Sequence, residues 1–134
     1  MLRYIWARLV YTWGGLHRYF GIQNSMRSEF EHAVRYFDRA LEIDPTFERV
    51  QLERGILLFR ELNRPEEAAA DFTALLRSEK LRGKALFNRA LVHQQYGRFR
   101  QAYQDLEQFL QNPDPAYQQD ALRLRQHLKE ILDA

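Results

Sequence analysis

The chain has 134 residues, of which 46% are hydrophobic and 28% charged, a composition ordinary for one soluble domain with a buried core. It contains no cysteine, which excludes disulfide bonds and cysteine-based metal or redox chemistry. The formal net charge is only +2, but residues 1–27 hold four arginines and no acidic residue, so the basic character is concentrated at the start of the chain.

Residues 1–15 form an N-terminal arm that is rich in aromatic side chains. Large apolar residues recur at spacings of three and four from the arm into the following segment, a pattern typical of an amphipathic helix. The pair Gly14-Gly15 weakens the helical pattern and leaves two alternatives open, a helix that runs through and one that breaks there. The members of this apolar stripe are Leu2, Ile5, Leu9, Trp13, Leu16 and Phe20.

The arm has two interpretations. In the first, which we favour because Trp13 and Phe20 continue one stripe into the next segment, it is an intramolecular cap over the first helical hairpin. In the second, it anchors the chain to a membrane surface or a partner through Arg3, Trp6, Arg8 and Trp13. Arginine and histidine interrupt the arm too often for a membrane-spanning helix, which needs about 20 apolar residues, or for a secretory signal.

An amphipathic helix is predicted over residues 30–45, where apolar and small residues recur at helical spacing. Ser28 and Glu31 have the spacing of a capping box, which would start this helix. Pro45 would end it, because a proline disfavours helical dihedrals in the residue before it. We also expect Asp44 to cap the next helix, with Pro45 in its first position.

The same pattern recurs about every 34 residues. A period of this length, with small residues at two fixed places in each unit, is typical of stacked helical hairpins, because small residues let the two helices of a hairpin approach closely. The corresponding positions are Ala33, Ala68 and Ala102; Phe37, Phe72 and Leu106; Leu41, Leu76 and Leu110; and Gly21, Gly55 and Ala90.

Over residues 14–115 the chain resembles the tetratricopeptide repeat family. The family pattern has a small residue in the first helix, glycine and an aromatic at the turn, alanine early in the second helix, and alanine-leucine before a closing proline. The middle unit departs from it in having an extra residue at its turn, Leu75 in place of alanine, and no closing proline. The third unit matches at Ala90, Gly97, Phe99, Ala102, Leu110 and Pro113; the first at Gly21, Phe30, Ala33, Ala40, Leu41 and Pro45; and the middle unit at Gly55, Ala68, Phe72 and Leu76.

The resemblance implies an all-α fold, a right-handed solenoid of antiparallel helix hairpins. We expect one domain over residues 1–134, composed of the arm (1–15), three repeats (14–47, 48–82 and 83–114) and a C-terminal capping helix (115–134). The capping helix is predicted to close the last repeat with an apolar face made of Tyr117, Ala121, Leu124, Leu128 and Ile131.

The sequence offers no catalytic motif. Its histidines, His17, His32, His93 and His127, lie in different predicted helices, and none pairs with another at the i, i+4 spacing of helical metal motifs. No phosphate-binding loop or nucleophile elbow is present. We therefore expect no enzymatic activity, no cofactor and no metal. Nucleic-acid binding is disfavoured, because the repeats lack interleaved basic and aromatic clusters.

The resemblance places a partner site in a concave groove lined by the first helix of each hairpin. A clamp of lysine, asparagine and arginine, which grips chaperone C-termini in this family, is matched only at Lys84, since Ile56 and Asn88 stand at its other places. The mixed character of the groove favours an amphipathic helix or a mixed peptide. The projected groove residues are Arg18, Tyr19, Ile22, Arg49, Leu52, Glu53, Ile56, Arg60, Lys84, Phe87, Asn88, Leu91 and Gln95.

These observations predict a non-enzymatic, cytoplasmic adaptor or assembly factor that binds a peptide or amphipathic helix of a protein partner in the groove. The alternative is a peripheral subunit of a membrane or membrane complex, docked through the basic aromatic arm. Self-association through an uncovered repeat end is a third interpretation.

Overall fold

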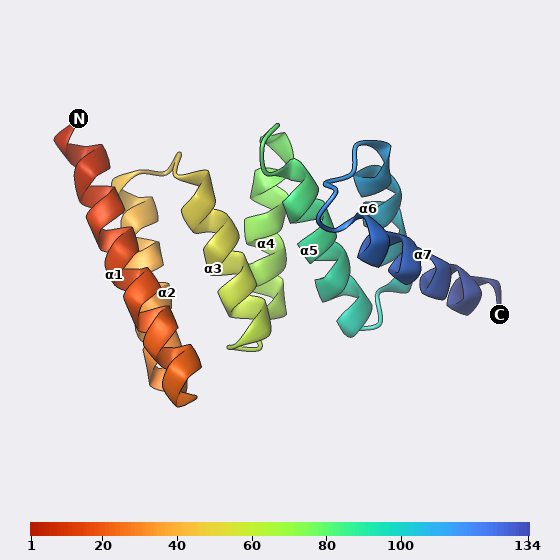
Figure 1. Ribbon diagram of the computed structural model, residues 1–134, viewed down its shortest axis with the longest axis horizontal. Coiled ribbons are helices and arrows are strands. Elements are labelled where there is room, and N and C mark those ends of the chain that lie inside the picture. The colour runs from red at the N-terminus through yellow and green to blue at the C-terminus, as the bar shows by residue number, and fades with distance from the viewer. The chain divides into compact units, whose positions relative to one another are not determined.

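A computed structural model describes all residues 1–134, and its regular elements are helices alone (Figure 1). The all-α class expected from the sequence is confirmed. The chain divides into two compact units, Met1–Asp71 and Phe72–Ala134, and the boundary falls within α4. The elements are α1 (Leu2–Asn24), α2 (Arg27–Ile43), α3 (Glu48–Arg60), α4 (Pro65–Ala74), a 3-10 turn η1 (Leu75–Arg77), α5 (Arg82–Gln95), α6 (Phe99–Gln111) and α7 (Gln118–Asp133).

In the first unit, α1 and α2 lie side by side as an antiparallel hairpin (Figure 1). Small residues of α1 face large rings of α2: a Cβ added to Gly21 would lie 2.8 Å from Cε1 of Phe30. Ala33, a predicted contact position, is fully buried, as are its counterparts Ala68 and Ala102. The predicted burial of all three alanines is confirmed. The buried residues that α1 contributes are Ala7, Val10, Gly14 and Gly21.

The helix α1 is continuous, so of the two alternatives at Gly14-Gly15 the helix that runs through is the one observed. The arm and the first helix of repeat one are parts of this single element. Gly14 is required for packing and not for a turn, because its backbone lies against Phe37. Close approach between two helices is a second reason for glycine in a helix, and the sequence pattern did not separate it from a break.

Two predicted helix caps are wrong. The helix α2 begins at Arg27, before Ser28, and its N-cap residue Met26 makes no side-chain capping bond. Asp44 ends α2 and does not start α3, which begins at Glu48. The Oδ1 atom of Asp44 accepts hydrogen bonds from the backbone N and the Oγ1 of Thr46, at 3.1 and 2.6 Å. It thereby stabilises the α2–α3 turn.

A partly buried ion pair links α3 to α4. The Arg54 guanidinium donates two hydrogen bonds to the Asp71 carboxylate, at 3.0 and 2.6 Å, and a third to Asp38 at 2.8 Å. Burial raises the pKa of the Asp71 carboxyl, although Arg54 acts in the opposite direction. One repeat later, Arg89 makes the same two-bond contact with Asp105, at 2.8 and 2.6 Å, inside the second unit.

The second unit has its own apolar core between α5, α6 and α7. Gly97, at a positive φ of 76°, makes the tight α5–α6 turn that the sequence predicts. Tyr117 stacks on Phe87 with ring centroids 4.9 Å apart. The final helix is confirmed as a cover for α6, although Ile131 at its end is exposed. The core residues are Leu86, Phe87, Ala90, Ala102, Leu106, Phe109, Ala121 and Leu128.

Candidate interaction surface on the first helix

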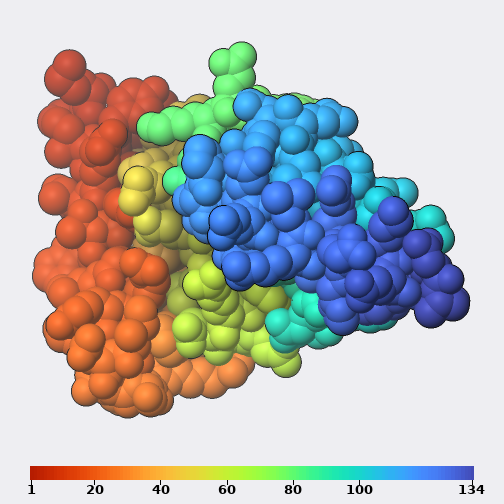
Figure 2. All heavy atoms as spheres, turned by 45° about the vertical axis from the view of Figure 1, so that its right-hand side comes forward, coloured from red at the N-terminus to blue at the C-terminus, as the bar shows by residue number.

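The apolar stripe of α1 faces outward, so the expectation that this stripe packs on the first hairpin is wrong, although the arm does pack on α2 through Ala7 and Val10. Leu2 is 82% exposed, Leu9 50% and Trp13 55%. The helix packs on α2 through its small residues instead, since small side chains allow a closer approach than the large stripe residues would. Most of the exposed large hydrophobic side chains of the chain therefore lie in residues 1–26. Figure 2 shows α1, in red and orange, at the surface of the first unit along its whole length.

We call this surface the outer face of α1. It comprises Leu2, Ile5, Leu9, Trp13, Leu16 and Phe20.

The charged residues of α1 itself have one sign. Arg3 and Arg8 are exposed on α1, and no acidic residue precedes Glu29 in the chain. The Arg3 guanidinium lies over the ring of its neighbour Tyr4, 5.0 Å from the centroid, while Arg8 lies 5.6 Å from the centroid of Phe47. Both arginines thus keep their charge at the surface without an acidic partner within the helix.

The structure brings four predicted groove residues together. Arg18 and Ile22 of α1 and Ile56 and Arg60 of α3 line one small hollow of about 100 Å³, together with Leu57 and Glu61. The Nε atom of Arg18 is buried there and has no hydrogen-bond partner. This hollow lies between the first helices of two successive hairpins.

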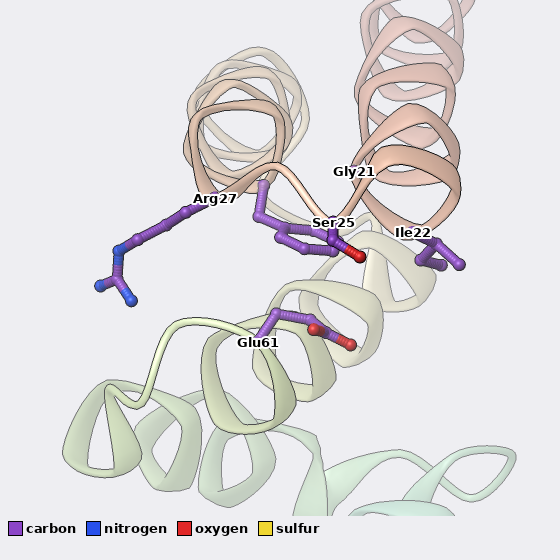
Figure 3. A pocket seen from close by; sticks show the side chains of 6 residues that line it. Gly21, Ile22, Ser25, Arg27 and Glu61 are labelled. Carbon is purple, nitrogen blue, oxygen red and sulfur yellow. The ribbon is translucent and has the colours of Figure 1, made fainter.

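A larger hollow of about 360 Å³ adjoins the first and shares Ile22 and Glu61 with it. In Figure 3, Ser25 of the α1–α2 turn and Glu61 at the end of α3 face each other across this space. Ser25 adopts a left-handed backbone conformation, with φ 53°, that closes α1. The other residues that line this larger hollow are Gly21, Arg27 and Phe30.

Tyr11 of α1 forms a polar link with two further groove residues, Arg49 and Glu53 of α3. The Tyr11 hydroxyl donates a 2.8 Å hydrogen bond to Oε1 of Glu53, and the Nε of Arg49 donates to the same oxygen at 3.3 Å. Burial raises the pKa of the Tyr11 phenol, and the bond to Glu53 adds to the rise. The phenol therefore stays protonated and holds the Glu53 carboxylate in place. Sequence reasoning selected Arg49 and Glu53 but missed Tyr11.

The other projected groove residues divide by exposure. Leu52, Phe87 and Asn88 are buried, and the Asn88 amide donates to the backbone oxygen of Lys84 at 2.8 Å. These three side chains are therefore occupied within the fold. Tyr19, Arg60 and Gln95 are exposed, whereas Lys84 and Leu91 are half-buried. All four residues named as an anchor, Arg3, Trp6, Arg8 and Trp13, are exposed.

No helix of the structure has both the length and the apolar character needed to cross a membrane.

Comparison with known proteins agrees with the repeat architecture. The chain is similar in structure to the TPR domain of Arabidopsis OM64, with a TM-score of 0.72 and 20% sequence identity, over 93% of this chain and 98% of that one. The chain thus has the tetratricopeptide-repeat fold that its sequence resembles. No protein-family profile matches the sequence, and no curated protein matches it.

Proposed function

We propose that this protein is a non-enzymatic interaction module that binds an acidic amphipathic helix of a protein partner on the outer face of α1. The observation that supports this most strongly is the exposure of the stripe from Leu2 to Phe20 on a helix whose opposite side is packed on α2. A stripe of this length is larger than the scattered apolar residues of an ordinary surface.

The chemistry of the partner follows from the charge around the stripe. The charged side chains of α1 are Arg3, Arg8 and Arg18, with no acid among them, so acidic residues beside the apolar stripe of a partner would meet complementary charge. Leucine and tryptophan at spacings of three and four suit the equivalent spacing on a partner helix. The expected partner segment therefore has apolar residues at helical spacing with Asp or Glu on its flanks.

A protein partner fits the surface better than a flat bilayer. Ile22 is exposed next to the stripe and lines both hollows between α1 and α3. A partner helix can extend a side chain into such a hollow, whereas a lipid surface meets only the outermost residues. The groove residues Arg18, Ile56 and Arg60 would then contact the end of the partner segment.

Photo-crosslinking in living cells tests this proposal by position. Benzoylphenylalanine at position 13, on the outer face, is expected to give an adduct with one protein, mapped to an amphipathic acidic helix. The same probe at position 122 is the control, since Leu122 is an exposed apolar residue of α7. Equal adducts at both positions, or an adduct of two copies of this chain, would contradict the proposal.

Membrane docking is the competing outcome, because Trp6 and Trp13 are exposed on the same helix as Arg3 and Arg8. A membrane anchor predicts binding to vesicles that contain anionic lipid, weakened by salt. Our proposal predicts that the protein stays unbound on such vesicles at physiological ionic strength. Cosedimentation of the purified chain with phosphatidylserine vesicles separates the two.

A further inference from the structure

A cluster of metal-ligating side chains joins α1 to α2. His17 comes from α1, and Glu29 and His32 come from the first turns of α2, three residues apart and hence on one side of that helix. A Glu and a His at this spacing are a known way for one helix to supply two ligands to a metal. The sequence search missed the cluster because its third member lies on the other helix of the hairpin.

The three side chains already lie close to one another. The Nδ1 of His17 and Oε2 of Glu29 are 2.6 Å apart, and the rings of His17 and His32 have centroids 5.3 Å apart. One ligand atom from each residue can be chosen so that all lie within 4.8 Å of one another. Tetrahedral ligands of zinc stand roughly 3.3 Å apart, given bonds of about 2.0–2.2 Å, so small side-chain rotations would complete the site.

The surroundings hold the ligands in place and leave one of them unsatisfied. Tyr36 stacks on the His17 ring, with centroids 5.1 Å apart and planes 13° from parallel. The Nδ1 atom of His32 is buried and has no hydrogen-bond partner. A buried polar atom without a partner is costly, and a ligand that it can bind removes that cost. His17 and Glu29 keep about a quarter of their side chains exposed, at 26% and 23%, which gives an ion a way in.

We propose that His17, Glu29 and His32 form a site for one divalent transition-metal ion, of which Zn²⁺ fits best. Two imidazoles and one carboxylate are a ligand set that zinc uses, with a fourth position left for water. The ion would bind Nδ1 of His17 and Oε2 of Glu29 in place of the proton that they share, which is released to solvent while Nε2 of His17 carries the remaining ring proton, and it would add His32 as a third ligand. Because the ligands come from both helices, the bound ion clamps α1 onto α2 and stabilises the folded hairpin.

The proposal goes beyond the partner-binding function and is tested without any partner. Titration of the untagged, full-length chain with Co²⁺ reports the geometry of the ligands through visible absorption. We expect saturation at one ion per chain, displacement of Co²⁺ by Zn²⁺, and a Zn²⁺-dependent rise in melting temperature. His17→Ala and His32→Ala should each weaken binding about tenfold or more, since even outer-shell changes cost about 10–100-fold.

His127→Ala is the matched control, because His127 is exposed on α7 and belongs to no cluster. It should bind like the wild type. If His17→Ala unfolds, Glu29→Gln keeps the size and hydrogen-bonding capacity of the side chain while removing the ligand charge, and circular dichroism verifies the fold. Absence of saturable binding in the wild-type chain would overturn the site. So would equal weakening by His127→Ala and His32→Ala.

Discussion

The backbone of Gly14 lies directly against the ring of Phe37. A Cβ added to Gly14 would stand 2.6 Å from Cε1 and 2.7 Å from Cδ1 of that ring, and 3.1 Å from Cβ of Tyr36. Phe37 is fully buried and cannot move aside easily. Gly14 therefore allows α1 to pack closely on α2. Because α1 packs through this side, its outer face is directed outward. Its neighbour Gly15 has open space where its Cβ would lie.

These adjacent glycines make a matched pair of variants. Gly14→Ala should lower the free energy of unfolding by about 1–3 kcal/mol through overpacking. Gly15→Ala should raise it by about 0.5–1 kcal/mol, because alanine is the better helix former and meets no neighbour. Urea unfolding followed by circular dichroism measures both. Equal effects of the two substitutions would mean that α1 does not pack on α2 in this register.

The repeat register is tested at Ala68, which is fully buried on α4. Ala68→Leu should lower the free energy of unfolding by about 1–3 kcal/mol, since the larger side chain has no room between the helices. Ala70→Leu, on the exposed side of the same helix, is the control and should change it by less than about 0.5 kcal/mol. Thermal melts that do not distinguish the two variants would contradict the packing.

The ion pair of Arg54 with Asp71 predicts that removal of Arg54 lowers the free energy of unfolding by an amount that depends on pH. Arg54→Met leaves the Asp71 carboxylate buried and unpaired, so it should cost about 2–4 kcal/mol at neutral pH. The double variant Arg54→Met/Asp71→Leu should recover most of this loss, because no buried charge remains. Chemical unfolding of the single and double variants measures the difference.

The sign of the pH dependence follows from burial, which raises the pKa of Asp71 even in the wild type. Without Arg54 that pKa rises further above its unfolded value. The folded variant then takes up a proton that the unfolded chain does not, so its stability falls as pH rises through this range. We therefore expect Arg54→Met to lower the free energy of unfolding less in mildly acidic buffer than at neutral pH. A penalty that grows on acidification would contradict the assignment.

Much of the fold could be predicted from sequence, because each repeat carries its own packing signal. Ala33, Ala68 and Ala102 stand where a small residue is needed between helices, and all three are buried. Helix ends were harder to predict. Ser28 has capping-box spacing, yet α2 starts at Arg27, because one favourable side-chain bond is worth only about 1 kcal/mol and packing of the whole helix outweighs it.

The site was predicted less well, because α1 carries two patterns at once. Its large residues, such as Leu9 and Trp13, form the more conspicuous stripe and were assigned to the interior. Its small residues, such as Ala7 and Val10, form a second stripe that packs on α2. Hydrophobicity alone favours burial of the larger stripe, whereas the closeness of the α1–α2 contact is set by side-chain size. The His17 cluster has only a partial local signal, the spacing of Glu29 and His32, because its third ligand lies on another helix. The hollow between α1 and α3 combines residues distant in the chain, and only the family resemblance placed four of them in one groove.

The most direct test of the central claim is the affinity of the crosslinked partner helix, as a synthetic peptide, for variants of the outer face. We predict by calorimetry that Leu9→Ser/Trp13→Ser weakens binding about a hundredfold, because each truncation of a buried anchor costs about 1–3 kcal/mol. The control Leu122→Ser/Ile131→Ser, on exposed residues of α7, should bind with unchanged affinity. Unchanged binding by Leu9→Ser/Trp13→Ser, with weakened binding by the α7 control, would contradict the account.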